Sequence, residues 1–204
     1  MKKIFITREL AGNAEELLIK KGFKVEVFRE DRSISTKLLM QKASDADALI
    51  TLLTDRIDKK VIDGLKKCKI IANCAVGFNN IDIEYAGSNN IVVTNTPDIL
   101  NDATADLTVA LILACARRLR EGELMMRSEK FKIWKPQLLL GLEMKGRTVG
   151  IIGAGRIGYA VAKRLNSFGS RIIYFDRNKR ENFEKEFNAK KVSLNSLLKN
   201  ADIV

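Results

Sequence analysis

A short apolar strand that runs straight into a glycine-rich turn constrains this chain more than any other feature. We expect Thr148 to Ile152 to form the strand, and Gly153-Ala154-Gly155-Arg156-Ile157-Gly158 follows it without a break. A helix ending at Gly169 is predicted next, followed by a strand from Arg171 to Phe175 and then Asp176. One face of that helix has the apolar residues Ile157, Val161, Leu165 and Phe168. An ordinary glycine-rich turn would not explain why a strand precedes it, a helix and a second strand follow it, and Asp176 comes directly after that second strand.

Each part of this βαβ unit has a physical role at a nucleotide site. Gly153 permits the tight turn, Gly155 lets the backbone approach a pyrophosphate, and Gly158 lets helix and strand pack closely. The start of the helix offers unpaired N–H groups and positive potential to the phosphates. Asp176 can accept hydrogen bonds from ribose hydroxyls and would repel a 2′-phosphate, which favours NAD over NADP. Arg177 could reach such a phosphate, so NADP stays open as the second choice.

The first hundred residues alternate short apolar runs with amphipathic stretches. We expect strands at 4–6, 25–28, 48–51, 70–76 and 91–93, and helices at 10–21, 35–43, 58–66 and 82–86. This alternation predicts a parallel sheet covered on both faces, whose ligands bind at loops after the strands. The loop Val76 to Asn80 is one such place, because Gly77 allows close approach and backbone N–H groups could receive an anion. An ordinary strand-ending turn explains the same residues.

Composition narrows the class of protein. A 46 % hydrophobic fraction in 204 residues suits a globular chain with a core. The longest apolar run, Leu107 to Ala116, is about half of the ~20 residues that cross a bilayer. Cys68, Cys74 and Cys115 are scattered and form no CxxC pair, which argues against disulfides or a metal site and for a cytoplasmic protein.

The formal charge of +11 raises the question of nucleic-acid binding. From Lys145 onward there are 13 basic and 5 acidic residues, but no basic stripe interleaved with aromatics. A lysine-rich surface explains this charge, so we expect neither a nucleic-acid nor a membrane partner. The chain contains no histidine.

A long apolar helix is predicted between the two halves. Asn101 or Asp102 can cap it, it should run to Arg120, and its middle from Leu107 to Ala116 is apolar all round. Such a helix should be buried on most sides, at a domain boundary or a subunit interface. In the less regular stretch that follows, we expect Trp134 and the leucines at 138–140 to pack against another apolar surface, such as that of a second subunit.

Three segments resemble the D-isomer-specific 2-hydroxyacid dehydrogenases. They are NCAVGFNNID at 73–82, VTNTPDILNDATADLTVALILACARRL at 93–119 and LLGLEMKGRTVGIIGAGRIG at 139–158. Within that family the Thr-Pro-Asp turn and the segment before Gly141 are most similar to glyoxylate/hydroxypyruvate reductases. The resemblance implies an α/β fold: a flavodoxin-like substrate domain over 1–98, then a hinge helix and an incomplete Rossmann dinucleotide-binding domain over 99–204.

The resemblance also implies site residues. The backbone of Val76 and Gly77 would hold the substrate carboxylate, and Leu52 and Leu53 would flank the pocket. Val76 would also contact the cofactor. The other implied cofactor residues are Thr104, Gly153, Gly155, Arg156, Ile157, Gly158, Asp176 and Arg177.

The activity implied is hydride transfer from reduced nicotinamide to a small 2-oxo acid such as glyoxylate or hydroxypyruvate. The family's catalytic arginine, glutamate and histidine fall beyond the position of Val204, so no catalytic residue is assigned. We therefore expect a C-terminally truncated chain, a fragment or frameshift product that is inactive alone, and a homodimer at full length. The alternatives are a non-catalytic NAD(H)-binding or regulatory module, and 3-phosphoglycerate as substrate.

The resemblance further predicts an exposed sheet edge. A Rossmann sheet needs its fourth strand beside its first. From Lys145 there is room for three strands, the third beginning at Ala201, so Thr148 to Ile152 should lie at an open edge.

Overall fold

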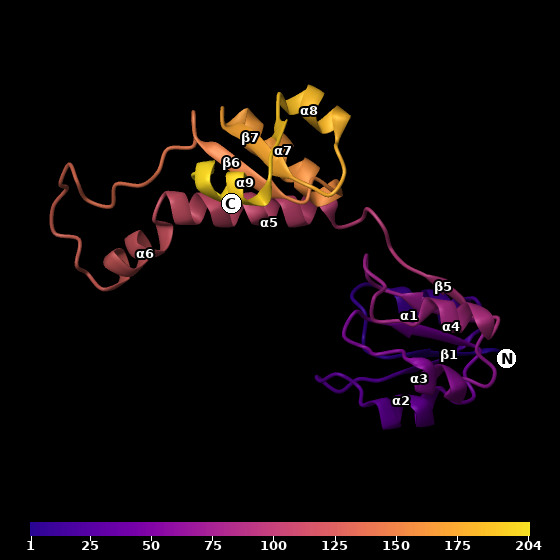
Figure 1. Cartoon of the computed structure of the whole chain (residues 1–204). Helices are drawn as coiled ribbons and strands as arrows, with labels where there is room; N and C mark the ends of the chain where they lie inside the picture. The colour runs from indigo at the N-terminus through magenta and orange to yellow at the C-terminus, as the bar shows by residue number, and fades with distance from the viewer. The chain divides into compact units, whose positions relative to one another are not determined.

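The computed structural model describes residues 1–204, which divide into two compact units, Met1–Ile99 and Leu100–Val204. The first unit is drawn in indigo to magenta and the second in pink to yellow (Figure 1). Each unit has its own parallel sheet and its own hydrophobic core. None of the helices has both the length and the apolar character that a membrane span requires.

Unit 1 is a five-stranded parallel sheet with helices between the strands. The strand order is β2-β1-β3-β4-β5, which is the flavodoxin-like order. The strands are β1 (Lys3–Ile6), β2 (Lys24–Val27), β3 (Ala48–Thr51), β4 (Ile70–Asn73) and β5 (Val92–Thr94). The helices are α1 (Ala14–Lys20), α2 (Thr36–Ala43), α3 (Lys59–Gly64) and α4 (Ile83–Ser88). The flavodoxin-like fold predicted for the first half is therefore confirmed.

Local chemistry sets the ends of these elements. The side chains of Ser35, Asp58 and Asp82 accept the first free N–H groups of α2, α3 and α4, as N-terminal caps do. Strand β4 ends at Asn73, three residues before the predicted end. The reason is that the Ala75 N–H turns back to the Asn73 carbonyl oxygen.

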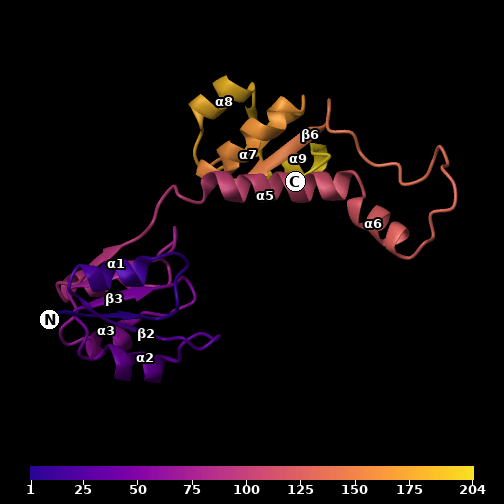
Figure 2. The same cartoon turned by 180° about the vertical axis from the view of Figure 1, so that it is seen from behind.

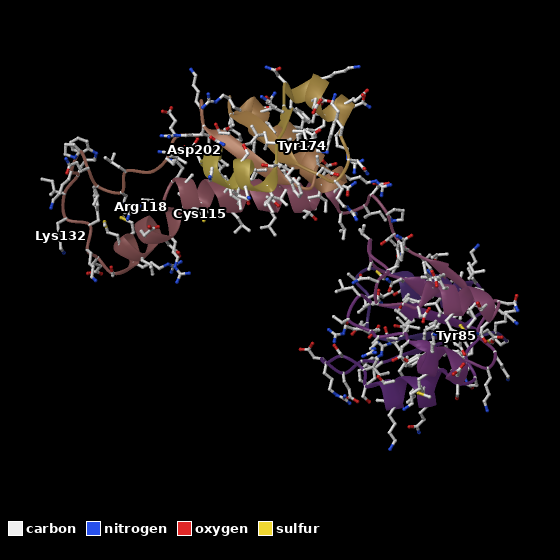
Figure 3. All side chains as sticks on the ribbon, in the orientation of Figure 1. Tyr85, Cys115, Arg118, Lys132, Tyr174 and Asp202 are labelled. Carbon is white, nitrogen blue, oxygen red and sulfur yellow. The ribbon has the colours of Figure 1, made fainter.

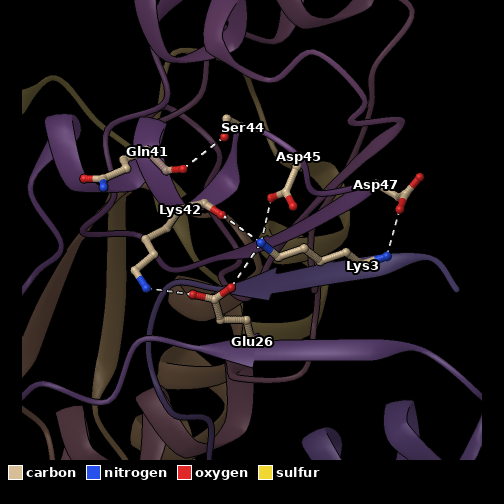
Figure 4. A network of polar contacts seen from close by, with 7 residues as sticks. All are labelled: Lys3, Glu26, Gln41, Lys42, Ser44, Asp45 and Asp47. Carbon is tan, nitrogen blue, oxygen red and sulfur yellow. Dashed lines mark hydrogen bonds and ion pairs between the residues drawn. The ribbon is translucent and has the colours of Figure 1, made fainter.

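An ion-pair network fixes β1 against its neighbours (Figure 4). Lys3 Nζ lies 3.0 Å from Glu26 Oε2 on β2 and 2.6 Å from Asp45 Oδ1 in the loop before β3. The Lys3 N–H donates to Asp47, and Lys42 of α2 binds the second oxygen of Glu26 at 3.0 Å. Burial alone would lower the pKa of Lys3, but its hydrogen bonds to Asp45 and Glu26 outweigh burial and raise it.

Unit 2 is built on three parallel strands in the order β6-β7-β8. They are β6 (Thr148–Ile152), β7 (Arg171–Phe175) and β8 (Lys190–Lys191). The helices are α5 (Asn101–Ala116), α6 (Leu119–Arg127), α7 (Arg156–Ser167), α8 (Glu181–Phe187) and α9 (Leu194–Asn200). Helix α7 joins β6 to β7, so the predicted βαβ unit is confirmed. Of the four residues predicted for its apolar face, Val161 and Leu165 are buried, whereas Ile157 and Phe168 are exposed.

The prediction that β6 lies at an open edge of the sheet is wrong. Ile203 pairs with Val149 in a parallel bridge, and the Gly150 N–H donates to the Ile203 carbonyl oxygen at 2.8 Å. Asp202 Oδ2 also accepts the Thr148 N–H at 2.7 Å. The third strand in sequence is β8, which consists of two lysines and therefore has no apolar signal. Residues after α9 thus lie beside β6, the place of the fourth strand in a Rossmann sheet.

Helix α5 is less buried than its apolar composition predicts. It ends at Ala116, because Arg118 takes a left-handed conformation (φ 53°) and α6 begins after it (Figure 3). Helix α7 covers only one side of α5, so Leu107 and Leu111 are 61 % and 58 % exposed. Within unit 2, α6 and the segment after it extend away from the sheet (Figure 2). Trp134 in that segment is 72 % exposed, so its predicted packing is not found within the chain.

Candidate functional site

The glycine turn after β6 has the geometry that its sequence predicts. Gly153 has a φ of +93°, which favours glycine. A β-carbon on Gly158 would come within 3.0 Å of the Gly153 carbonyl oxygen and 3.2 Å of Ile151 Cγ2. Helix α7 therefore packs directly against the turn. Around Gly155, in contrast, nothing lies within 4 Å of such a β-carbon, so the backbone is open to approach.

A cavity of about 640 Å³ opens at the start of α7. Its lining includes Asn101, Ala154, Gly155, Arg156, Tyr159 and Arg180. A neighbouring cavity of about 460 Å³ shares Ala154, Tyr159 and Arg180 with it. Of the predicted cofactor residues, Gly155 and Arg156 line the larger cavity. Thr104 on α5 and Ile157 on α7 are exposed to solvent. Both helices contribute residues to the lining of the larger cavity, but the side chains of Thr104 and Ile157 line neither cavity.

Asp176 lies at the end of β7 and reaches back to the glycine turn. Its Oδ2 accepts the Ala154 N–H at 3.1 Å, and its Oδ1 accepts the Asn178 N–H at 3.0 Å. Arg180 Nε lies 3.3 Å from Oδ2. The Asn178 N–H, together with Arg180, holds the pKa of Asp176 below its ordinary value against the opposing effect of burial. Arg177, the other predicted residue here, is exposed and lines neither cavity.

Two tyrosines that the sequence analysis did not single out support this site. Tyr174 is fully buried; its hydroxyl accepts the Arg180 N–H at 2.9 Å and donates to Glu184 at 3.0 Å (Figure 3). Tyr159 stacks edge-on against Phe187, and its hydroxyl hydrogen bonds to Glu186. These contacts fix the loop after β7 and helix α8. A signal for Tyr174 was present, because it lies two residues before Asp176 in a strand.

The residues of the turn fit a dinucleotide. A pyrophosphate needs backbone N–H donors that are not already bound, at a point where no β-carbon blocks the approach. The N–H groups of Gly155 and Ile157 donate to no acceptor within the chain, and the space at Gly155 is open. Arg156 adds a positive charge at the same cavity. Together with the carboxylate of Asp176, this set matches the demands of a pyrophosphate and a ribose.

In unit 1, a buried polar network ties together the loops after β1, β3 and β4. Thr7 Oγ1 donates to Asp55 Oδ2, which also accepts the Leu52 N–H at 2.8 Å. Asn80 Nδ2 donates to the Leu52 carbonyl oxygen at 3.1 Å, and Asn73 Nδ2 donates to the Gly77 carbonyl oxygen at 2.9 Å. The sequence analysis missed this network, because single polar residues at strand ends give no periodic signal.

This buried polar network holds the loops after β3 and β4, which contain the residues predicted to bind the substrate. Val76 and Gly77 follow β4, and their N–H groups donate to no acceptor within the chain. The Val76 carbonyl oxygen is held by Asn95 Nδ2 at 2.8 Å. Leu52 and Leu53 follow β3, and exposed Leu53 lines a cavity of about 420 Å³ together with Arg56. Leu52, Val76 and Gly77 lie outside that cavity's lining.

Comparison with known proteins decides the family. Residues 4–199 match the family model described as D-isomer specific 2-hydroxyacid dehydrogenase, catalytic domain. The chain belongs to this family. The resemblance inferred from three short segments is thus confirmed over nearly the whole chain.

Individual dehydrogenases of the family agree with this assignment. The chain is 47 % identical to the glyoxylate reductase of Thermococcus kodakarensis, over 99 % of this chain and 62 % of that protein. A crystal structure from Thermus thermophilus matches with a TM-score of 0.91 at 42 % identity, over 98 % of this chain and 62 % of that one. The D-lactate dehydrogenase of Aquifex aeolicus, solved with NAD and lactic acid, matches with a TM-score of 0.83 at 25 % identity, over 98 % and 59 %. The chain therefore spans about three-fifths of the length of these dehydrogenases.

Proposed function

We propose that these residues form the substrate-binding and cofactor-binding parts of an NAD-linked reductase of small 2-oxo acids, such as glyoxylate or hydroxypyruvate. The observation that carries this proposal is the convergence of an open glycine turn, free N–H groups and Asp176 at one end of β6 and β7. The likeness to a glyoxylate reductase supports the choice of substrate.

We assign the substrate domain to residues 1–98, and the hinge helix with the cofactor domain to residues 99–204. In the first, the free N–H groups of Val76 and Gly77 would bind the substrate carboxylate, beside Leu52 and Leu53. In the second, Gly155, Arg156 and the start of α7 would bind the pyrophosphate. The remaining cofactor contacts that we propose are Thr104, Gly153, Ile157, Gly158 and Arg177, with Val76 from the substrate domain. We place the protein in the cytoplasm, in keeping with its three free cysteines.

The nicotinamide, when bound, supplies the hydride that reduces the keto carbon. This chain's residues would hold the substrate by its carboxylate and the cofactor by its phosphates and ribose. Asp176, whose pKa is lowered chiefly by the hydrogen bond from the Asn178 N–H, would accept the ribose hydroxyls. That role favours NAD over NADP.

A phosphorylated substrate fits less well. The cavity lined by Leu53 has one cation, Arg56, and three carboxylates, Asp55, Asp58 and Asp82. Such a surface would repel the phosphate of 3-phosphoglycerate. Glyoxylate or hydroxypyruvate carries a single negative charge, for which the Val76–Gly77 backbone suffices.

A second candidate is a non-catalytic NAD(H)-binding module. The observation that favours it is that the chain has no histidine to donate the proton. A positioned general acid contributes about 10²–10⁴-fold to rate. We therefore expect these 204 residues alone to bind NADH with little or no turnover.

A second copy of the chain is the partner that we propose for unit 2. Leu107 and Leu111 lie one turn apart on α5 and are both exposed, and Trp134 in the segment after α6 is exposed as well. Exposed apolar side chains that gather on one face are typical of an interface. A homodimer would also account for the extended segment after α6.

The test is an assay of NADH oxidation with glyoxylate, hydroxypyruvate and 3-phosphohydroxypyruvate, run beside a calorimetric titration with NADH. Turnover with either of the first two substrates in a polypeptide that includes the family's histidine supports the reductase. NADH binding without turnover in that polypeptide supports the binding module instead. If none of the three acids is reduced and NADH does not bind, both functions are wrong.

A further inference from the structure

Two asparagine side chains hold the backbone of the loop after β4. Asn73 Nδ2 donates to the Gly77 carbonyl oxygen at 2.9 Å, and Asn95 Nδ2 donates to the Val76 carbonyl oxygen at 2.8 Å. Resting on the substrate site proposed above, we propose that these two asparagines are positioning residues, which turn the N–H groups of Gly77 and Phe78 towards the substrate carboxylate. They act through the backbone and do not themselves contact the substrate.

The geometry of the peptide group links each asparagine to one N–H group. A trans peptide is planar, and its C=O and N–H bonds point in opposite directions. All peptide bonds of the chain are trans. The Val76 carbonyl group shares a peptide plane with the Gly77 N–H, so Asn95 fixes the direction of that N–H. In the same way, Asn73 holds the Gly77 carbonyl group and fixes the direction of the Phe78 N–H.

The N–H groups of Gly77 and Phe78 are free to bind a ligand. They donate to no acceptor within the chain, and both residues are exposed. The carbonyl groups of the same two peptides point towards Asn73, the last residue of β4, and Asn95, the residue after β5. The two N–H groups therefore point away from the ends of these strands. Apart from chain neighbours, only Asn79 Oδ1, at 3.4 Å, lies within 4 Å of where a β-carbon on Gly77 would be.

The side-chain amide of Asn73 is itself held in one orientation. Asn73 is 2 % exposed, and Thr51, its partner in register on β3, is fully buried. The Gly77 carbonyl oxygen can only accept a hydrogen bond, so Nδ2 must face it, and Oδ1 then accepts the Thr51 hydroxyl at 2.8 Å. Asn73 Nδ2 also donates to Asn80 Oδ1 at 3.1 Å, and Asn80 Nδ2 donates to the Leu52 carbonyl oxygen at 3.1 Å. The donor to Gly77 therefore belongs to the buried polar network of unit 1.

No other hydrogen bond within the chain holds the carbonyl oxygen of Val76 or Gly77. A peptide that loses its asparagine can therefore turn, and ordering it again weakens the binding of an anion. The preceding peptide behaves differently, because the Ala75 carbonyl oxygen accepts the Thr96 N–H at 2.9 Å. This backbone bond survives any side-chain substitution, so the Val76 N–H is an internal reference.

The test is an NMR titration of the isotope-labelled 204-residue chain with sodium glyoxylate, against sodium chloride at equal ionic strength, for the wild type, Asn73→Ala and Asn95→Ala. In the wild type we expect glyoxylate to shift the amide signals of Val76, Gly77 and Phe78. Asn95→Ala should reduce chiefly the shift of Gly77, and Asn73→Ala chiefly that of Phe78, while Val76 keeps its response. Each variant should raise the dissociation constant about threefold to tenfold, as expected for the loss of one hydrogen bond.

The matched control is Asn89→Ala. Asn89 Nδ2 makes the same kind of bond, at 2.9 Å to the Tyr85 carbonyl oxygen, at an exposed place in the same unit. This variant should leave the titration unchanged. An equal loss in Asn89→Ala, or unchanged shifts in both Asn73→Ala and Asn95→Ala, would overturn the proposal while leaving the carboxylate site intact.

A loss spread equally over all three amides would also overturn the proposal, because it would show a general loss of structure. If no amide of the loop shifts in the folded wild type, the proposed substrate site fails, and this inference with it. If Asn73→Ala does not fold, Asn73→Leu takes its place, since it fills the space of the amide without a donor. An unchanged Phe78 shift in that variant would again contradict the proposal.

Discussion

Gly158 lies directly against the carbonyl group of Gly153. A β-carbon added at position 158 would come within 3.0 Å of the Gly153 carbonyl oxygen. A carbonyl in a tight turn cannot move aside without moving the turn. The first turn of α7 and the glycine turn are therefore one rigid piece, and a ligand at the turn meets N–H groups that are already in position.

We expect Gly158→Ala to destabilise unit 2 by about 1–3 kcal/mol, the usual cost of forcing an extra methyl group into a packed site. NADH binding should weaken with it, because the turn must shift. Urea unfolding and calorimetric titration measure the two effects. Gly155→Ala is the matched control: its β-carbon meets nothing within 4 Å, so stability should hardly change while the pyrophosphate approach narrows. Equal stability of Gly158→Ala and the wild type would contradict the packing.

The buried contact between Thr7 and Asp55 gives a second prediction. Thr7→Val keeps the shape of the side chain but removes the hydroxyl that donates to Asp55, a residue only 4 % exposed. Leaving this buried carboxylate short of a donor should cost about 1–3 kcal/mol in the free energy of unfolding of unit 1. Thr54→Val, in an exposed position of the same loop, should cost much less. A similar loss in both variants would show that Thr7 has no special role.

The Lys3 network predicts a dependence of stability on pH. Lys42 foremost, and then Lys3, lower the pKa of Glu26 in the folded chain. A lowered pKa means that the stabilisation is fully present above the ordinary carboxyl pKa of about 4.5 and is lost as the pH falls below it. Lys3→Met should therefore flatten the fall in unfolding free energy between about pH 5 and pH 3. Parallel curves for the two proteins in urea titrations at each pH would contradict this.

The apolar face of α5 gives a prediction about assembly. Leu111→Glu places a charge on the face that we propose a second copy covers, so it should shift the chain from dimer towards monomer in sedimentation velocity. Leu17→Glu, on α1 and 51 % exposed, should leave the sedimentation coefficient unchanged. A wild-type chain that sediments as a monomer at all concentrations would contradict the dimer.

The parts of the fold that follow from hydrophobic periodicity were predictable, and so was the glycine turn. Strands β3 and β7 have the predicted bounds, since each is a run of apolar residues between polar ends. The pairing of Ile203 beside Val149 was not predictable, because two residues of strand show no period.

Side-chain networks escaped prediction for a different reason. Asp55 and Asn80 are separated by 25 positions and meet only because parallel strands end at the same edge of the sheet. Arg180 meets Asp176 through a loop whose path depends on the Tyr174 hydroxyl. The exposure of Leu111 also could not be foreseen, since composition shows that a face is apolar but not what covers it.

The most direct test of the dinucleotide site is a calorimetric titration of the folded 204-residue chain with NADH, repeated for Asp176→Asn. We expect saturable binding at one site per chain, weakened about tenfold or more when the ribose acceptor loses its charge. A folded chain that takes up no NADH at millimolar concentration, or one whose binding is indifferent to Asp176→Asn, would contradict it.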